Sequence, residues 1–148
     1  MKILIAFSGH HDESTEVTHP AFRFPWPEDA EIHVLSVAEV LYPVMVGMVP
    51  DAVDVTDVAM RTAEQAQSEA DDVALRFRKL GYRAEGFSTR DDPENAILEH
   101  ARQWGADLIV VGLHDRSRME RFLAGSVSEY MVKHAPCSVL VLKHSSGA

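Results

Sequence analysis

Five short segments carry the hydrophobic pattern of β-strands. Three are nearly continuous apolar runs, which is typical of strands buried on both faces of a parallel sheet. The other two alternate more weakly but are rich in strand-forming residues. The predicted strands are Lys2–Phe7, Glu31–Ala38, Tyr82–Ser88, Asp107–Gly112 and Ser138–Lys143.

Helical patterns lie between these strands. Apolar residues recur at helical spacing from 55 to 77, and Gly81 follows as the expected stop. Asp92 and Pro93 fit the N-cap and the first position of a further helix, which Gly105 would end. One more helix is expected to end before the final strand. Strands and helices therefore alternate along the chain.

Three segments do not follow this pattern. The first crossover should hold a short helix at 12–19, followed by an irregular turn at 24–27 that contains two prolines. The segment 42–54 is irregular and unusually apolar. It could act as a lid, pack on a partner subunit, or pack on its own domain. The tail 144–148 is expected to fray.

The alternation of strands and helices predicts an α/β domain that spans residues 1–148. Its sheet should be parallel and doubly wound, with right-handed crossovers and helices on both faces. Ligands in such sheets bind at the carboxyl ends of the strands.

Composition narrows the possible partners. The net charge of −9 argues against nonspecific binding to nucleic acid or to an anionic membrane. No apolar run approaches the roughly 18 residues that a membrane-spanning helix needs. Cys137 is the single cysteine, so no disulfide can form within the chain, and we expect a cytoplasmic protein.

The loop after the fourth predicted strand is the best candidate site. Gly112 and Gly125 would let the backbone approach a ligand closely. Ser126 and Glu129 have the spacing of a capping box at the start of the last helix. The free N–H groups and the positive dipole end of that helix suit a phosphate. The alternative is that Gly125-Ser126 only begins a helix.

The C-terminal third, ADLIVVGLHDRSRMERFLAGSVSEYMVKHAPCSVLVLK, resembles universal stress proteins. The long loop, the G-S start, S-E-Y, H-A-P-C and the final strand occur in the family's order, and KILIAFSG and EIHVLSV fit more loosely. The resemblance implies a fold like that of universal stress proteins and adenine nucleotide alpha hydrolases, with five parallel strands in the order 3-2-1-4-5. It also implies a homodimer formed through the last strand, Ser138–Lys143.

Many members of this family bind ATP through the motif G-x-x-G-x9-G-(S/T). Gly112, Gly125 and Ser126 match this motif, whereas Asp115 replaces the second glycine. Nucleotide-binding members also often carry an aspartate just after the first strand, where this chain has Ser8. The resemblance implies that ATP or a related adenine nucleotide binds here, and the predicted contact residues are Gly112, Gly125, Ser126, Val127, Ser8 and Val37.

Asp115 bears on the affinity for ATP. A carboxylate among phosphate donors repels a phosphate by about 1 kcal/mol at roughly 4 Å in water, and by more where screening is poorer. Bound Mg²⁺ could reverse the sign of that effect. Arg116, Arg118 and Arg121 could also compensate, although loop arginines can equally be solvated.

A metal site is an alternative at the same edge of the sheet. His10 and His11 follow the first strand, and His114 and Asp115 follow the fourth, which is its predicted neighbour. Imidazoles and carboxylates are suitable ligands for zinc and similar metals. The competing interpretation is a polar rim of loops that happens to contain histidines.

We therefore expect a dimeric stress-response module that binds a nucleotide and has no catalytic residue. Slow ATP hydrolysis is the enzymatic alternative, and it would require a metal and a group that positions water. A structural or regulatory dimer without any ligand is a third possibility. No G-x-S-x-G nucleophile elbow is present, His134 suits a helix C-terminus, and Cys137 is expected to be buried and inert.

Overall fold

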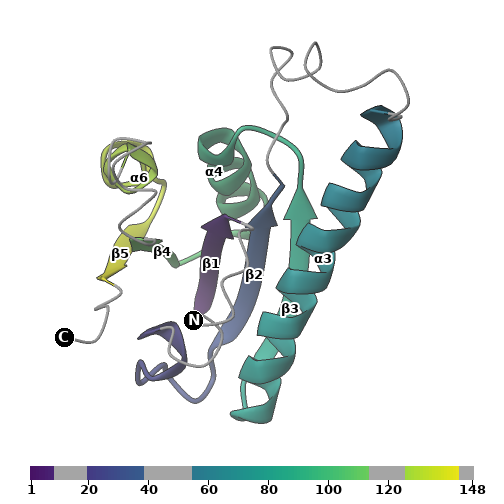
Figure 1. The fold of residues 1–148 in the computed structure, drawn as a ribbon. Helices are drawn as coiled ribbons and strands as arrows, with labels where there is room; N and C mark the ends of the chain where they lie inside the picture. The colour runs from purple at the N-terminus through teal and green to yellow at the C-terminus, as the bar shows by residue number, and fades with distance from the viewer. Residues whose placement is uncertain (9–19, 39–54, 114–125, 144–148) are drawn as a thin grey trace, which may run out of the picture.

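The protein folds into one five-stranded parallel sheet with helices on both faces (Figure 1). The structure is a computed structural model, and it describes residues 1–8, 20–38, 55–113 and 126–143. The strand order is β3-β2-β1-β4-β5, as the resemblance to universal stress proteins implied. The strands are β1 (Lys2–Ser8), β2 (Glu31–Val37), β3 (Arg83–Thr89), β4 (Leu108–Leu113) and β5 (Ser138–Lys143).

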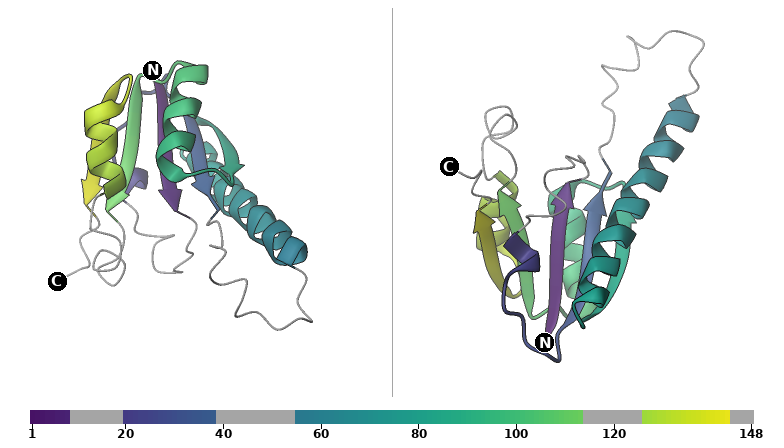
Figure 2. Two further views of the ribbon diagram at one scale, coloured as in Figure 1. Left: turned by 90° about the horizontal axis from the view of Figure 1, so that it is seen from above. Right: turned by 60° about the horizontal axis from the view of Figure 1, so that its bottom comes forward.

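Three α-helices and one short 3-10 helix η1 (Pro20–Phe22) accompany the sheet in the described residues. The long helix α3 (Val55–Lys79) covers one face, and α4 (Pro93–Trp104) and α6 (Ser126–His134) cover the other (Figure 2). Each face has its own hydrophobic cluster, because successive residues of a strand point to opposite faces. In the part of the chain that the structure describes, no helix is long and apolar enough to cross a membrane.

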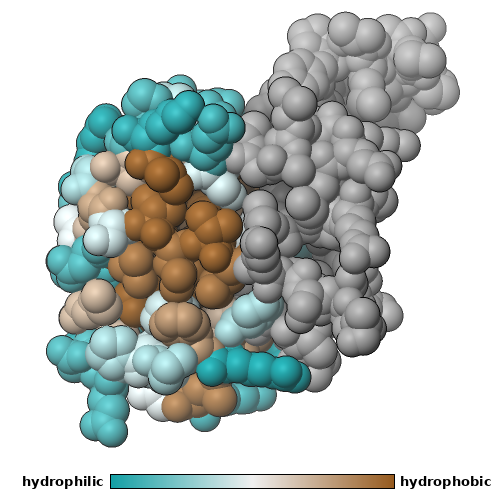
Figure 3. Space-filling view, turned by 90° about the vertical axis from the view of Figure 1, so that its left-hand side faces the viewer, coloured by the Kyte–Doolittle hydropathy of each residue, from teal (hydrophilic) through white to brown (hydrophobic). Residues whose placement is uncertain are grey.

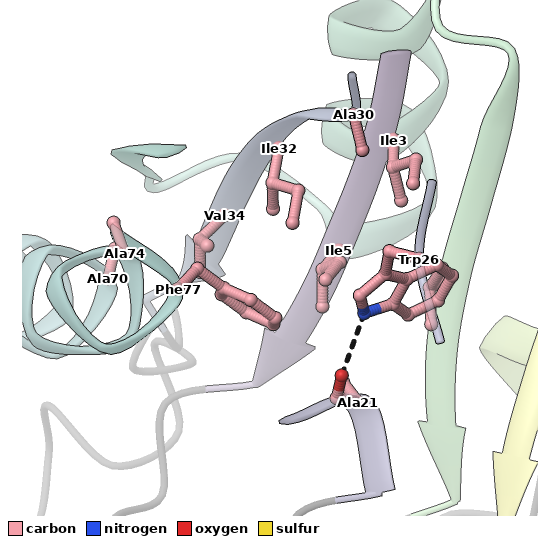
Figure 4. Packing of buried hydrophobic residues seen from close by; sticks show 11 residues of the cluster. Ile3, Ile5, Ala21, Trp26, Ala30, Ile32, Val34, Ala70, Ala74 and Phe77 are labelled. Atoms are coloured by element: carbon pink, nitrogen blue, oxygen red, sulfur yellow. Dashed lines mark hydrogen bonds between the residues drawn. The ribbon is translucent and has the colours of Figure 1, made fainter. Parts of the chain in front are cut away.

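Helix α3 approaches the sheet closely. Phe77 is fully buried and packs with Val34 and Ile5, while Ala70 and Ala74 turn their small side chains toward β2 and β3 (Figure 4). Gly86 makes this approach possible, because a Cβ at that position would lie only 2.7 Å from the Ala70 carbonyl carbon. Overpacking of this kind typically costs about 1–3 kcal/mol.

The predicted helix ends are confirmed where the structure describes them. The carboxylate of Asp92 accepts a hydrogen bond from the Asn95 N–H at 3.2 Å, and Pro93 is the first residue of α4. Gly105 ends α4 in the left-handed region with a φ of 75°. Gly81 follows α3 with a φ of 101°. Both glycines adopt a conformation that other residues reach only at a cost.

The irregular turn predicted at 24–27 is confirmed, and the structure adds the short helix η1 before it and the burial of Trp26 within it. Trp26 is 6% exposed, and its Nε1–H donates to the Ala21 carbonyl at 2.8 Å (Figure 4). The hydroxyl of Tyr82 donates to the Trp26 carbonyl at 3.3 Å. The indole thus closes the core on the α3 side of β1 and β4. The predicted helix at 12–19, the apolar segment 42–54 and the tail 144–148 lie outside the described residues.

Candidate functional site

The carboxyl ends of β1, β2 and β4 meet at one end of the sheet, which we call the carboxyl edge. The opposite end, where the parallel strands begin, is the amino edge, and both differ from the lateral edge strands β3 and β5. Ser8 is the register partner of Val37, and Ala6 is the partner of Val111. Carried on along both strands, this register brings Ser8 level with Leu113, one residue beyond Gly112. Three of the sequence-predicted contact residues therefore lie within the last residues of neighbouring strands.

Helix α6 brings its N-terminus to the same edge. It follows β4 and leads back to Ser138, the first residue of β5, which pairs with Leu108 at the opposite edge of the sheet. Its direction is therefore antiparallel to the strands. The first backbone N–H groups of an α-helix have no carbonyl partner within the helix and carry its positive dipole end. The edge thus combines strand ends with donors that suit an anion.

The apolar side of α6 fixes its position. Met131 is fully buried and Val127 is half-buried, and both belong to the cluster on the α4 side of the sheet. Val37 also belongs to this cluster and is 4% exposed. The side chains of Val37 and Val127 therefore contribute to the core, and a contact with a ligand would fall to their backbone.

Charge near the start of α6 is balanced locally. Glu129 accepts a hydrogen bond from Lys133 Nζ at 2.9 Å, and both side chains are exposed. Such i,i+4 pairs contribute only tenths of a kcal/mol and are screened by salt. The predicted capping box between Ser126 and Glu129 remains a prediction, because the Ser126 side chain is not among those described.

Several predicted site residues lie outside the described residues. They are Gly125, His10, His11, His114, Asp115, Arg116, Arg118 and Arg121. Within residues 1–8, 20–38, 55–113 and 126–143, no three His, Cys, Asp or Glu side chains come together as a metal site would require. The metal alternative at His10, His11, His114 and Asp115 therefore remains a prediction.

Cys137 and His134 lie at the opposite edge of the sheet, at the end of α6. Cys137 is half-buried rather than buried as predicted, because only part of its side chain packs against the cluster on the α4 side of the sheet. This partial burial is the first cause that raises the pKa of the Cys137 thiol, and the nearby Asp107 carboxylate raises it further. A raised pKa keeps the thiol protonated and unreactive. The ring of His134 packs against Tyr130 at a centroid distance of 4.3 Å, in the last turn of α6.

Sequence reasoning missed two polar features of the sheet. Ser36, on the α3 side of β2, is fully buried, and its hydroxyl has no hydrogen-bond partner in the described structure. His33, on the other side of β2, contacts His100 of α4. The i,i+4 spacing of His100 and Trp104 was a usable signal for the second feature, since such residues share a helix face.

A family comparison agrees with this architecture. Residues 1–143 match the model of the universal stress protein family. The chain belongs to the universal stress protein family. Universal stress protein MJ0531 of Methanocaldococcus jannaschii is 32% identical over 142 residues, which cover 96% of this chain and 81% of that protein.

Solved structures share the fold at low sequence identity. The structure of the hypothetical protein MJ0577 has a TM-score of 0.70 and 20% identity, and the match covers 97% of both chains. UspA from Lactobacillus plantarum has a TM-score of 0.66 and 21% identity, covering 95% of this chain and 96% of the other.

Some of the similar structures contain nucleotides. An Arabidopsis thaliana universal stress protein with AMP bound has a TM-score of 0.61 and 20% identity, covering 98% of this chain and 92% of that one. An Archaeoglobus fulgidus family member in complex with dAMP has a TM-score of 0.57 and 21% identity, covering 97% and 98%. A further universal stress protein in complex with cAMP has a TM-score of 0.55 and 18% identity, covering 96% and 95%.

Proposed function

We propose that this universal stress protein binds ATP or a related adenine nucleotide at the carboxyl edge of its sheet and acts as a dimeric stress-response module. One observation carries the proposal: Gly112, at the end of β4, lies at the edge to which the N-terminus of α6 points. The bound AMP, dAMP and cAMP in similar structures support an adenine nucleotide as the ligand.

In this proposal the phosphates lie at the first turn of α6. The backbone N–H groups of Ser126 and Val127 would donate to phosphate oxygens, together with Gly125 from the preceding loop. Ser8 is the last residue of β1 and Val37 is the last residue of β2, and both strands lie on the side of β4 that is away from β5. These two residues would line the part of the site that holds the nucleoside. A backbone site of this kind can hold an anion even in a protein whose net charge is −9.

Asp115 makes divalent cations part of the proposal. Its carboxylate replaces the second glycine of the family motif and would repel a bare triphosphate. A bound Mg²⁺ would sit favourably between this carboxylate and the phosphates. We therefore expect ATP to bind more tightly with magnesium than without it, and we expect AMP to depend less on magnesium.

Calorimetric titration of the full chain with ATP and AMP, with and without MgCl₂, tests the proposal. The decisive variant is Ser126→Asp, which places a negative charge at the first turn of α6. An acidic residue is favourable there for the helix itself, so the fold should be retained. Repulsion of the phosphate should cost about 1 kcal/mol or more, which weakens binding roughly fivefold.

Leu80→Asp is the matched control, because Leu80 is 55% exposed in the turn between α3 and β3, at the opposite edge of the sheet and outside β5. It adds the same charge and should leave nucleotide affinity unchanged. Absence of binding heat for both nucleotides in every condition, together with no nucleotide in extracts of freshly purified protein, would reject the proposal. That result would favour the ligand-free structural dimer.

The dimer would form through β5, which is an edge strand of the sheet. Apolar side chains gather on the side of the molecule that carries β5 and α6 (Figure 3). Val139, Leu140, Val141 and Leu142 are all only half-buried in the isolated chain. An apolar edge strand with unpaired backbone groups is a template for pairing, and a second copy would satisfy it.

Light scattering coupled to size-exclusion chromatography tests the dimer. Val141→Lys should shift the mass from two chains to one, because a charge on the edge strand opposes pairing. Leu80→Lys is the control, since Leu80 is 55% exposed in the turn between α3 and β3. A monomeric wild-type protein at micromolar concentration would contradict this part of the proposal.

A further inference from the structure

A ring cluster ties the C-terminal half of α4 to the sheet at the edge opposite the nucleotide site. His33 Nδ1 and His100 Nε2 are 2.9 Å apart, so the two imidazoles share a hydrogen bond. The ring of His33 stacks on Trp104, with centroids 3.5 Å apart and an interplanar angle of 8°. Phe87 of β3 completes the cluster at 4.5 Å from His33. The cluster therefore joins α4 to both β2 and β3.

The hydrogen bond between His33 and His100 depends on their protonation. One ring must donate an N–H and the other must offer a lone pair, which requires at least one neutral imidazole. When both rings are protonated, two N–H groups and two positive charges face each other. The contact that joins β2 to α4 then becomes repulsive.

Burial keeps this pair neutral. The pKa of His33 is lowered to about 4. Burial is the largest cause, and the positive form of His100 is the second. Burial also lowers the pKa of His100. Half-burial between Phe87 and Trp104 supplies the desolvation in both cases, because a charged imidazole loses water there.

Charged side chains from β1, β2 and β3 surround the pair of His33 and His100. Lys2 of β1 lies 5.6 Å from the Trp104 ring centre, donates to the Trp104 carbonyl, and lowers the pKa of His33. Glu31 of β2 raises that pKa, but its carboxylate also pairs with Arg83 of β3 at 3.4 Å. Glu85, the register partner of His33, is exposed. Because the effects of Lys2 and Glu31 on the pKa of His33 have opposite signs, desolvation remains the main cause of its lowered pKa.

We propose that His33 and His100 form an acid-sensitive latch, which holds the last turns of α4 against β2 and β3 while the pair is neutral and releases them when both rings are protonated. The latch involves none of the nucleotide-site residues. It would make the stability of this helix respond to acid within the range in which histidine titrates.

The lowered pKa of His33 determines whether acid raises or lowers the stability of the fold. An unfolded histidine titrates near 6.5, so between about pH 6.5 and pH 4 the unfolded chain binds more protons than the folded one. The stability that the latch contributes is therefore complete above about pH 6.5. It is lost as the pH falls toward 4.

Two measurements on the full chain test the latch. Histidine-detected NMR titration should find a pKa of about 4 for His33 and a lowered pKa, below the usual 6.5, for His100 in the folded protein. Urea unfolding from pH 7.5 to 4.5 should show a falling midpoint, and His33→Phe should flatten that fall because phenylalanine keeps the stacked ring without titrating. His100→Gln should act in the same direction.

His134→Gln is the matched control, since His134 is exposed at the end of α6 and should leave the pH dependence as in the wild type. Amide exchange in residues 100–104, corrected for its intrinsic pH dependence, should rise relative to residues 66–77 as the pH falls to about 4, the pKa of His33. Titration of both rings at or above pH 6.5 would overturn the latch. An unchanged pH dependence of stability in His33→Phe would also overturn the latch. If His33→Phe does not fold, the pH dependence of His100→Gln and the titration of the wild-type histidines test the proposal instead.

Discussion

The two edges of the sheet are built differently. At the amino edge, the connections at 80–82, 105–107 and 135–137 are all three residues long. Here Asp107 binds β1 twice, since its N–H donates to the Lys2 carbonyl and its carboxylate accepts from the Lys2 N–H, both at 2.8 Å. At the carboxyl edge, β1, β2 and β4 are followed by the long connections 9–19, 38–54 and 114–125.

The difference concerns which backbone groups each edge leaves available. In the amino-edge turns 80–82 and 105–107, every backbone N–H donates to a backbone carbonyl, so these groups are not available to a ligand. The carboxyl edge instead has strand ends and the first N–H groups of α6, which have no carbonyl partner within the helix. This sheet therefore has its longer connections at one edge, whereas short turns and the contacts of Asp107 hold the strands in register at the other.

The largest effect is expected for Met131→Ala, because α6 spans both edges and Met131 is its fully buried anchor. Removal of the side chain should lower the free energy of unfolding by about 2–5 kcal/mol. Urea unfolding measures the loss. Val132→Ala, on the exposed side of the same helix at 64% exposure, should stay within about 0.5 kcal/mol of wild type. Equal losses in the two variants would show that α6 is not held by its inner side.

A smaller effect is expected for Gly105→Ala in the amino-edge turn after α4. A Cβ at Gly105 would meet no atom within 4 Å, so the cost arises from the φ of 75° alone. We expect thermal or urea unfolding to show a loss of about 1–2 kcal/mol. Gly105→Asn should lose less, since asparagine tolerates this conformation better. A wild-type stability for Gly105→Ala would mean that this turn is not under the backbone constraint described above.

The smallest effect is expected for Ser36→Ala, near the carboxyl end of β2. The buried hydroxyl of Ser36 has no partner in the described structure, so its removal leaves no group unsatisfied. Stability should change by less than about 1 kcal/mol. Ser88→Ala is the contrast, because the Ser88 hydroxyl donates to Gln67 Oε1 at 2.9 Å and that bond would be lost. A large loss in Ser36→Ala would point to a partner outside the described residues.

The strands and the helix ends were predictable because their causes are local. The apolar runs of β1, β4 and β5 predicted those strands to within one residue at each end. Asp92 and Gly105 predicted the two ends of α4 through capping and left-handed backbone geometry. The 3-10 turn η1 and the burial of Trp26 were missed, because three nearby prolines favoured an irregular segment and Trp26 is buried by core residues that are distant in the chain, such as Ile3 and Val110.

The candidate site was predictable only in outline. The spacing of Gly112, Gly125 and Ser126 identified the loop and the family. It did not indicate that the side chains of Val37 and Val127 would be used by the core. That division of roles depends on which face of β2 and of α6 turns inward, and packing of the two elements together decides it.

The sequence by itself therefore determined the class of fold, the order of its elements and the family, and it predicted the edge proposed for a ligand. Each follows from local periodicity, from capping chemistry or from a motif within one segment. The tertiary structure alone decided the close approach at Gly86 and the pairing of His33 with His100. These contacts join residues that are distant in the chain, and only the packing of helices onto the sheet brings them together.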